Sequence, residues 1–177
     1  MARITEQTAH EETLLAVAKK MIAAARTAPK GKGMSTLSTL IITGDDLLQL
    51  VDHTKKMGEK FDLPGFIRDS GNISKTTVAV AFGCTIEPLG LRKCGMCGFV
   101  NCDEKRKHPN IPCVFNPGDL GIAMGSALSI AADNRIDNRV MYSAGHALMD
   151  LGWLGEGIKI AYVVPLSISS KSVFFDR

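Results

Sequence analysis

The chain has 177 residues, of which 45% are hydrophobic, 22% are charged and 6% are aromatic, and its formal net charge is +3. This composition is typical of a globular protein and excludes a disordered, collagen-like or coiled-coil chain. A chain of this length buries enough surface to fold without a stabilising metal or disulfide, so a metal would serve another purpose. The length predicts a single domain over residues 1–177, and the small net charge argues against general attraction to nucleic acid or to a membrane surface.

The N-terminal region is acidic where a secretory signal would be apolar. Glu6, Glu11 and Glu12 all lie within the first fifteen residues, which excludes a signal peptide there. The longest apolar stretches, such as residues 120–132, fall short of the roughly 20 residues that span a bilayer. We therefore expect a soluble, cytoplasmic protein that does not associate with membranes.

Hydrophobic periodicity predicts alternating helices and strands. In chain order, we expect a helix over 5–26, a strand over 36–43, a helix from 44 to about 60, a loop marked by Pro64, Gly65 and Gly71, a strand over 76–82, an irregular segment over 84–116, helices over 119–132 and 141–151, and a strand over 158–164 that ends at Pro165. Alternation without a strict βαβ repeat favours an α/β, or α+β, sandwich in which helices cover a mixed sheet, with an irregular cysteine-rich insertion.

The irregular segment contains four of the five cysteines. They are Cys94, Cys97, Cys102 and Cys113, with the spacing Cys-x2-Cys-x4-Cys-x10-Cys. Four thiolates can close a tetrahedral zinc site or hold the four irons of a [4Fe-4S] cluster. Three cysteines within nine residues favour the cluster, because structural zinc sites usually combine two separated pairs. Gly95 and Gly98 follow the first two cysteines and allow the positive φ angles that would turn backbone N–H groups toward sulfur.

Zinc is the alternative metal. His108 could replace one cysteine, since zinc accepts a Cys3His ligand set, although its place among lysines, an arginine and a proline is typical of an exposed loop histidine. Cys84 lies at the end of a predicted buried strand, and we interpret it as a small hydrophobic core residue.

The stretch from Leu91 to Cys113 resembles the four-cysteine [4Fe-4S] domain of Rnf-type electron-transport complexes and of corrinoid iron-sulfur proteins. In those proteins a Cys-Gly-x-Cys-Gly-aromatic-x-x-Cys core recurs, and the fourth cysteine usually lies farther along the chain. With Asp119-Leu-Gly-Ile-Ala-Met-Gly-Ser-Ala after the segment and Pro165-Leu-Ser near the end, the whole chain resembles bacterial and archaeal ferredoxin-domain proteins of unassigned role. The resemblance implies a [4Fe-4S] cluster on the four cysteines.

Two other stretches resemble the nitroreductase-like flavoproteins. Ala24-Ala-Arg-Thr-Ala-Pro29, followed by a strand and Gly44-Asp-Asp, is similar to one of their motifs, and the helix after Asp119 is similar to their long central helix. The resemblance implies an α+β homodimer with FMN at the subunit interface. The Arg-Arg-Ser or Arg-Ser-x-Arg pattern that holds the FMN phosphate in that family is absent near the N-terminus. Arg26, Lys30 and Lys32 are the candidate phosphate contacts here.

The charge of the chain is concentrated beside the cysteines. From Arg92 to Cys113 there are five basic and two acidic residues, whereas the rest of the chain carries 16 of each. Cations at this place would stabilise a bound anionic cluster. Nucleic acid is not expected as a partner, because Phe99 is the only aromatic residue in this stretch.

Together these patterns predict an iron-sulfur redox protein that passes single electrons to a partner protein, to a small-molecule acceptor or to FMN. The sequence leaves open whether the chain is an enzyme, for which a flavin- or iron-sulfur-dependent oxidoreductase is the candidate. The alternative is a zinc-stapled interaction module whose basic flank docks an acidic partner.

Overall fold

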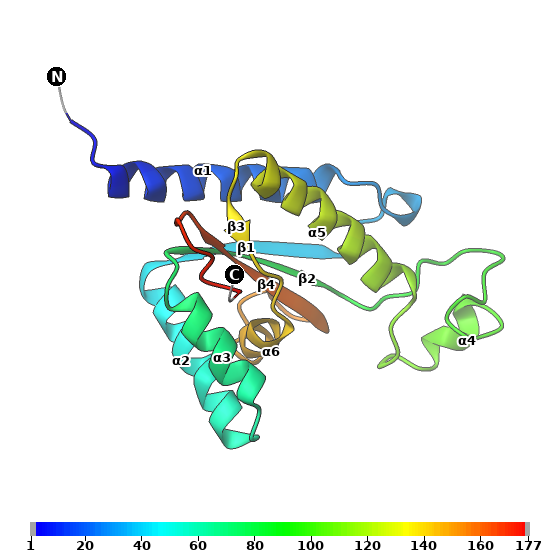
Figure 1. Cartoon of the computed structure of the whole chain (residues 1–177). Coiled ribbons are helices and arrows are strands. Elements are labelled where there is room, and N and C mark those ends of the chain that lie inside the picture. The colour runs from blue at the N-terminus through cyan, green and yellow to red at the C-terminus, as the bar shows by residue number, and fades with distance from the viewer. Residues whose placement is uncertain (1–2, 176–177) are drawn as a thin grey trace.

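A computed structural model describes residues 3–175 and shows a four-stranded sheet between two layers of helices (Figure 1). The elements in chain order are α1 (Glu6–Thr27), a short 3-10 turn (Gly31–Gly33), β1 (Leu37–Thr43), α2 (Gly44–Lys60), α3 (Pro64–Ile73), β2 (Val78–Cys84), α4 (Cys102–Arg106), α5 (Phe115–Asp133), β3 (Asp137–Asn138), α6 (Tyr142–Asp150) and β4 (Ile160–Ser167). Within the described residues, none of the helices combines the length and apolar character needed to cross a membrane.

The sheet has the strand order β1-β2-β4-β3, and all of its pairings are antiparallel. The sandwich is confirmed, but the expectation of a mixed sheet is wrong. A single crossover helix would carry the chain along the sheet and make the next strand parallel. Here α2 and α3 pack against each other as a helical hairpin, which returns the chain to the end of the sheet that it left. Val78 consequently begins β2 opposite Thr43, the last residue of β1.

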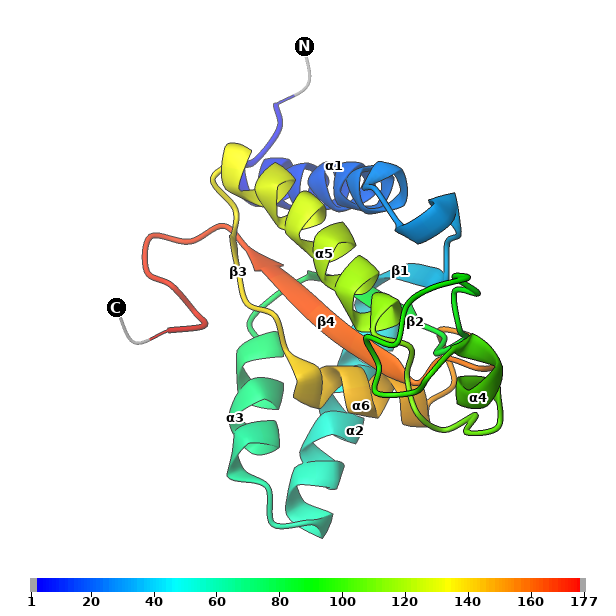
Figure 2. The same ribbon diagram turned by 90° about the vertical axis from the view of Figure 1, so that its right-hand side faces the viewer.

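Strand β2 lies in the centre and is buried along its whole length. Because successive side chains of a strand point to opposite faces, Val80 and Phe82 join the core formed with α1 and α5, whereas Ala79 and Ala81 join the core formed with α2, α3 and α6. Figure 2 shows these two groups of helices on opposite faces of the sheet. The central strand therefore connects two hydrophobic cores.

Two expected breaks in regular structure are absent. Pro64 and Gly65 begin helix α3 rather than a loop, because proline at the first position of a helix loses no intrahelical hydrogen bond. Pro165 does not end β4, which continues to Ser167 with Pro165 opposite Ala79 of β2. Helix α4 and the two-residue strand β3 were not expected from the sequence.

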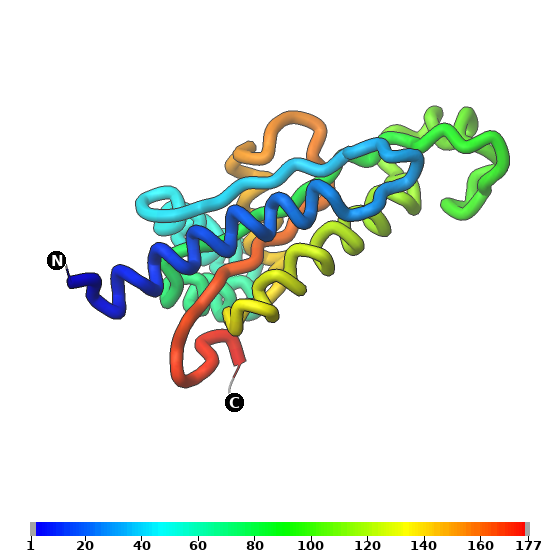
Figure 3. Tube along the Cα trace, turned by 90° about the horizontal axis from the view of Figure 1, so that it is seen from above, coloured from blue at the N-terminus to red at the C-terminus, as the bar shows by residue number. Residues whose placement is uncertain are grey.

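Residues 85–114 form an excursion between the end of β2 and the start of α5. Figures 1 and 3 show this excursion, with α4 in it, extending beyond the end of the sheet and away from the remaining helices. Its only regular element is α4. The irregular cysteine-rich insertion is thus confirmed, and we call residues 85–114 the projecting segment.

Candidate metal centre

The four predicted ligands all belong to the projecting segment or its last turn. Cys94, Cys97 and Cys102 are half-buried, Cys113 is buried, and all four are free thiols. Cys102 begins α4, and its Sγ lies 3.8 Å from the carbonyl oxygen of Leu91. The first three thiols are therefore reachable from solvent, whereas Cys113 lies where the segment meets the body of the protein.

Glycine shapes the backbone beside the first two cysteines. Gly95 and Gly98 both have φ of 88°, a left-handed conformation that strains other residues. The N–H of Gly98 donates to the carbonyl of Gly95 over 3.0 Å, which closes the turn that carries Cys97. The expectation that these two glycines supply positive φ is confirmed.

A side-chain cap fixes the start of α4 and, with it, the position of Cys102. The Oδ1 of Asn101 accepts the N–H of Glu104 over 2.9 Å, and a Glu104 carboxylate oxygen accepts the N–H of Val100 over 2.8 Å. Both bonds satisfy backbone donors around the first turn of a helix that is too short to be stable by itself. Cys102 is thus held at the start of a capped helical turn.

Two buried polar side chains fasten the root of the segment. Lys105 is only 2% exposed, and its Nζ donates to the carbonyl of Ile86 over 2.9 Å. Asn116, buried at the start of α5, donates through Nδ2 to the carbonyl of Glu87 over 3.0 Å. The sequence did not reveal either anchor, because Lys105 stands in a run of three basic residues that is typical of a solvated surface.

Cys84 is separate from the other thiols in environment and in chemistry. It is buried in the core of the α1 and α5 layer, and its Sγ lies 3.7 Å from the carbonyl oxygen of Asn116. Burial, helped by the negative charge of Asp119, raises the pKa of the Cys84 thiol to about 11. The interpretation of Cys84 as a small core residue is confirmed by its burial.

The ring of His108, the candidate fourth zinc ligand, packs against the ring of Phe99. The two ring centroids are 4.9 Å apart and the rings are 20° from parallel, so they stack. His108 itself is exposed. The stack ties the turn after Cys97 to the loop that leads to Cys113.

By its chemistry, a set of four thiols suits either a four-iron cluster or a zinc ion. Among residues 3–175, no three Cys, His, Asp or Glu side chains are grouped so as to hold a single metal ion. The projecting segment supplies the four free thiols that a four-iron cluster needs.

The three candidate phosphate contacts lie near the C-terminal end of α1, and all three form hydrogen bonds with the chain itself. Lys30 Nζ donates to the carbonyls of Ala25, Arg26 and Ala28 at 2.8, 3.1 and 2.9 Å, and partial burial and the nearby Arg26 charge lower the pKa of Lys30. Arg26 donates to Ser35 Oγ over 2.6 Å. Lys32 has a positive φ and lies 3.5 Å from the carbonyl of Leu89 at the root of the projecting segment. In the structure, Lys30 uses three donors to cap the C-terminal end of α1. Phosphate binding by these three residues stays a prediction.

The architecture is that of a nitroreductase-like α/β protein. Nitroreductase CinD from Lactococcus lactis, solved in complex with nicotinic acid, superposes with a TM-score of 0.60 at 16% identity, covering 94% of this chain and 84% of that one. An FMN-dependent nitroreductase from Clostridium difficile R20291 gives a TM-score of 0.53 at 12% identity, covering 96% and 79%. At these identities the likeness concerns the fold alone.

Sequence comparison gives the family. The model of the family described as "Uncharacterized protein containing a ferredoxin domain (DUF2148)" matches residues 110–177. A relative from Archaeoglobus fulgidus, described as an uncharacterized protein, is 35% identical over 166 residues, which cover 89% of this chain and 88% of the relative. The chain belongs to this family of ferredoxin-domain proteins.

Proposed function

We propose that the protein binds one [4Fe-4S] cluster through Cys94, Cys97, Cys102 and Cys113 and transfers single electrons to a redox partner. The observation that supports the proposal is that the projecting segment carries four free thiols on one anchored excursion. The family's ferredoxin domain supports the same cofactor. A cluster held there would accept and release one electron at a time.

The residues around the thiols have separate tasks in this proposal. Gly95 and Gly98 provide the left-handed turns after the first two ligands. Lys105 and Asn116 hold the backbone at Ile86 and Glu87, so that the segment keeps a fixed exit from the sheet. The basic residues place positive charge near the ligands and stabilise the more negative, reduced state of the centre.

Anaerobic purification followed by metal analysis tests the proposal. We expect a brown protein with broad absorption near ~400 nm and about four irons and four sulfides per chain. A colourless protein that holds one zinc per chain would contradict the cluster and favour the zinc-stapled interaction module instead.

A matched pair of cysteine variants identifies the ligands. Cys97→Ser should lose most of the iron, because it removes a ligand from the turn between Gly95 and Gly98. Cys84→Ser should keep the iron content of the wild type, because this thiol is buried in the core outside the projecting segment. Loss of iron from the Cys84 variant alone would show that the ligand set is wrong.

A flavin is the second cofactor to test, since one of the similar folds is an FMN-dependent nitroreductase. Heating the purified protein and recording the fluorescence of the supernatant would detect released FMN. If FMN is present, Arg26→Gln and Lys32→Gln should lower the flavin content if these side chains contact its phosphate. A flavin content unchanged in both variants would place the phosphate elsewhere.

A further inference from the structure

Three large apolar side chains are exposed among the proposed ligands. Met96 lies between the first two cysteines and is 68% exposed, Val100 lies between the second and third and is 82% exposed, and Ile111 precedes the fourth and is 42% exposed. Single exposed apolar residues are ordinary on protein surfaces, but a group of them on one excursion is typical of a contact surface.

Three basic side chains of the same segment are exposed and take part in no ion pair among the described residues. They are Arg92, Lys93 and Lys107. Both carboxylates between Arg92 and Cys113 are already engaged, Asp103 with Arg106 and Glu104 with the N–H of Val100. Since the chain outside Arg92–Cys113 carries equal numbers of acidic and basic residues, the formal excess of positive charge lies on this stretch of the projecting segment.

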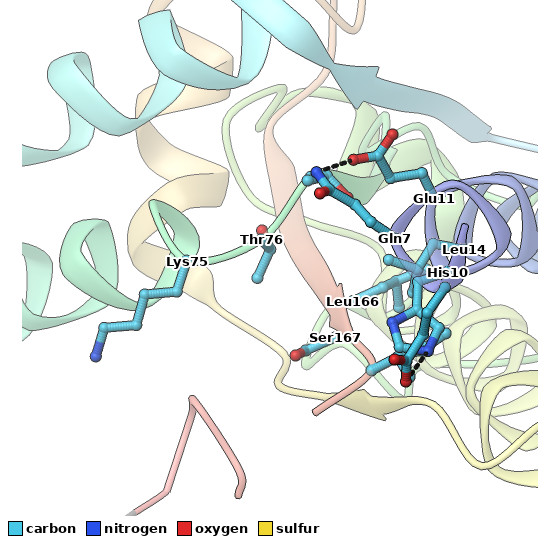
Figure 4. A pocket seen from close by; sticks show the side chains of 11 residues that line it. Gln7, His10, Glu11, Leu14, Lys75, Thr76, Leu166 and Ser167 are labelled. Atoms are coloured by element: carbon cyan, nitrogen blue, oxygen red, sulfur yellow. Dashed lines mark hydrogen bonds and ion pairs between the residues drawn. The ribbon is translucent and has the colours of Figure 1, made fainter. Parts of the chain in front are cut away.

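The other end of the sheet offers a different surface. A cavity of about 440 Å³ lies there between α1 and the ends of β2 and β4, lined by residues that include Gln7, His10, Lys75 and Ser167 (Figure 4). Its charged and polar groups largely pair with one another, His10 with Glu6 and Gln7 with Glu11. This cavity contains no cysteine and combines both signs of charge, so it lacks the chemistry that distinguishes the projecting segment.

We propose that the projecting segment is the docking surface for an acidic electron-carrier protein. Met96, Val100 and Ile111 would form the apolar contact, and Arg92, Lys93 and Lys107 would face carboxylates of the carrier. The inference rests on the proposed function, because docking there brings the carrier to the four cysteines. One electron passes from the reduced iron-sulfur centre, which is oxidised, to the oxidised carrier, which is reduced, and no bond is made or broken.

The binding experiment uses the full chain purified without oxygen, after its iron and sulfide have been counted. The probes are a plant-type [2Fe-2S] ferredoxin and a flavodoxin, both acidic, with the basic protein cytochrome c as the reference. We expect the acidic carriers to bind, the affinity to fall as salt is raised, and cytochrome c not to bind. Binding of cytochrome c as tight as that of the acidic carriers, or no binding of either acidic carrier, would overturn the docking proposal.

Charge-reversed pairs locate the surface. Arg92→Glu with Lys93→Glu should lower the association rate for the acidic carriers about 10-fold or more at low salt. Lys19→Glu with Lys20→Glu changes the net charge equally on the exposed side of α1 and should leave the rate within about two-fold of the wild type. Equal losses in both pairs would mean that net charge, and not this segment, governs the association.

An uncharged variant tests the apolar contact separately. Val100→Ser should weaken carrier binding several-fold without changing its salt dependence, because it removes apolar contact area and no charge.

The cluster proposal and the docking proposal are contradicted by different results. Iron-free protein that still binds acidic carriers through Arg92 and Lys93 would refute the cluster alone, whereas iron-loaded protein that binds neither carrier would refute the docking surface alone.

Discussion

Lys105 is a buried cation on the short helix that begins with Cys102. Residues three apart on a helix are neighbours on its surface, so Lys105 is a neighbour of Cys102, which is one of the proposed ligands. A buried charge is screened less than an exposed one. In the proposed centre, we therefore expect Lys105 to stabilise the additional negative charge of the reduced cluster more than the exposed lysines do.

Replacing Lys105 should lower the reduction potential of the cluster. We expect Lys105→Met to shift the potential downward in a titration followed by electron paramagnetic resonance, because the reduced state loses a nearby cation. The control Lys107→Met removes an exposed charge and should give a smaller shift in the same direction. Equal shifts in the two variants would contradict a special role for the buried side chain.

The five thiols should differ in reactivity. Burial raises the pKa of Cys84 to about 11, so at pH 8 this group is almost entirely the unreactive thiol. In metal-free, folded protein, iodoacetamide should therefore label Cys94, Cys97 and Cys102 within minutes and leave Cys84 unlabelled, as mass spectrometry of peptides would show. Unfolding in guanidinium should remove the difference, and rapid labelling of Cys84 in folded protein would contradict its environment.

Helix α6 depends on one glycine for its contact with the sheet. A Cβ atom on Gly145 would lie 2.0 Å from the carbonyl oxygen of Ala161 in β4. Gly145→Ala should therefore force the helix away from β4 and lower the free energy of unfolding by about 1–3 kcal/mol, or several degrees in Tm. Gly71→Ala in α3, where nothing lies within 4 Å, should instead raise the free energy of unfolding by about 0.5–1 kcal/mol. Thermal unfolding of the two variants checks both signs.

Sequence patterns predicted the long elements well, because each buries a regular apolar face. Helix α1 and strand β1 both lie within one residue of their expected limits. The errors involve proline, whose effect depends on position: Pro64 begins α3, and Pro165 lies within β4. Nothing local distinguishes these cases from a loop or a strand end. The antiparallel sheet was not predicted either. It depends on α3, which packs against α2 and returns the chain to β2, and Pro64 had suggested a loop where α3 begins.

The candidate site was predictable only in its cysteine spacing and its glycines. Those features are local in sequence and have a direct chemical meaning. The anchors of the segment depend on long-range contacts, from Lys105 to Ile86 and from Asn116 to Glu87, which leave no periodic pattern. Lys30 differs from these anchors. Its sequence position suggested an anion site, whereas in the structure its ammonium group caps the C-terminal end of α1.

At the scale of the whole molecule, the two cores share β2, so we expect residues 1–177 to unfold as one domain.

We also expect the protein to form a homodimer. The exposed side of α5 carries Ile122, which is 50% exposed, among Gly118, Gly121 and Gly125, and small residues let two helices approach closely. Light scattering after size exclusion should give about twice the 19.0 kDa of one chain, and Ile122→Glu should shift the protein toward the monomer. A wild-type mass of one chain would refute the dimer.

The contact between Cys84 and Asn116 closes the base of the projecting segment, because the last residue of β2 touches the first turn of α5 there. The entropic cost of joining two such neighbouring points grows only slowly with the number of residues between them. Residues 85–114 can therefore lengthen, shorten or be exchanged during evolution while the sheet and both cores stay unchanged. The sheet and its helices thus form a scaffold that does not depend on this insertion. A related protein could carry an insertion of different length and chemistry at the same place.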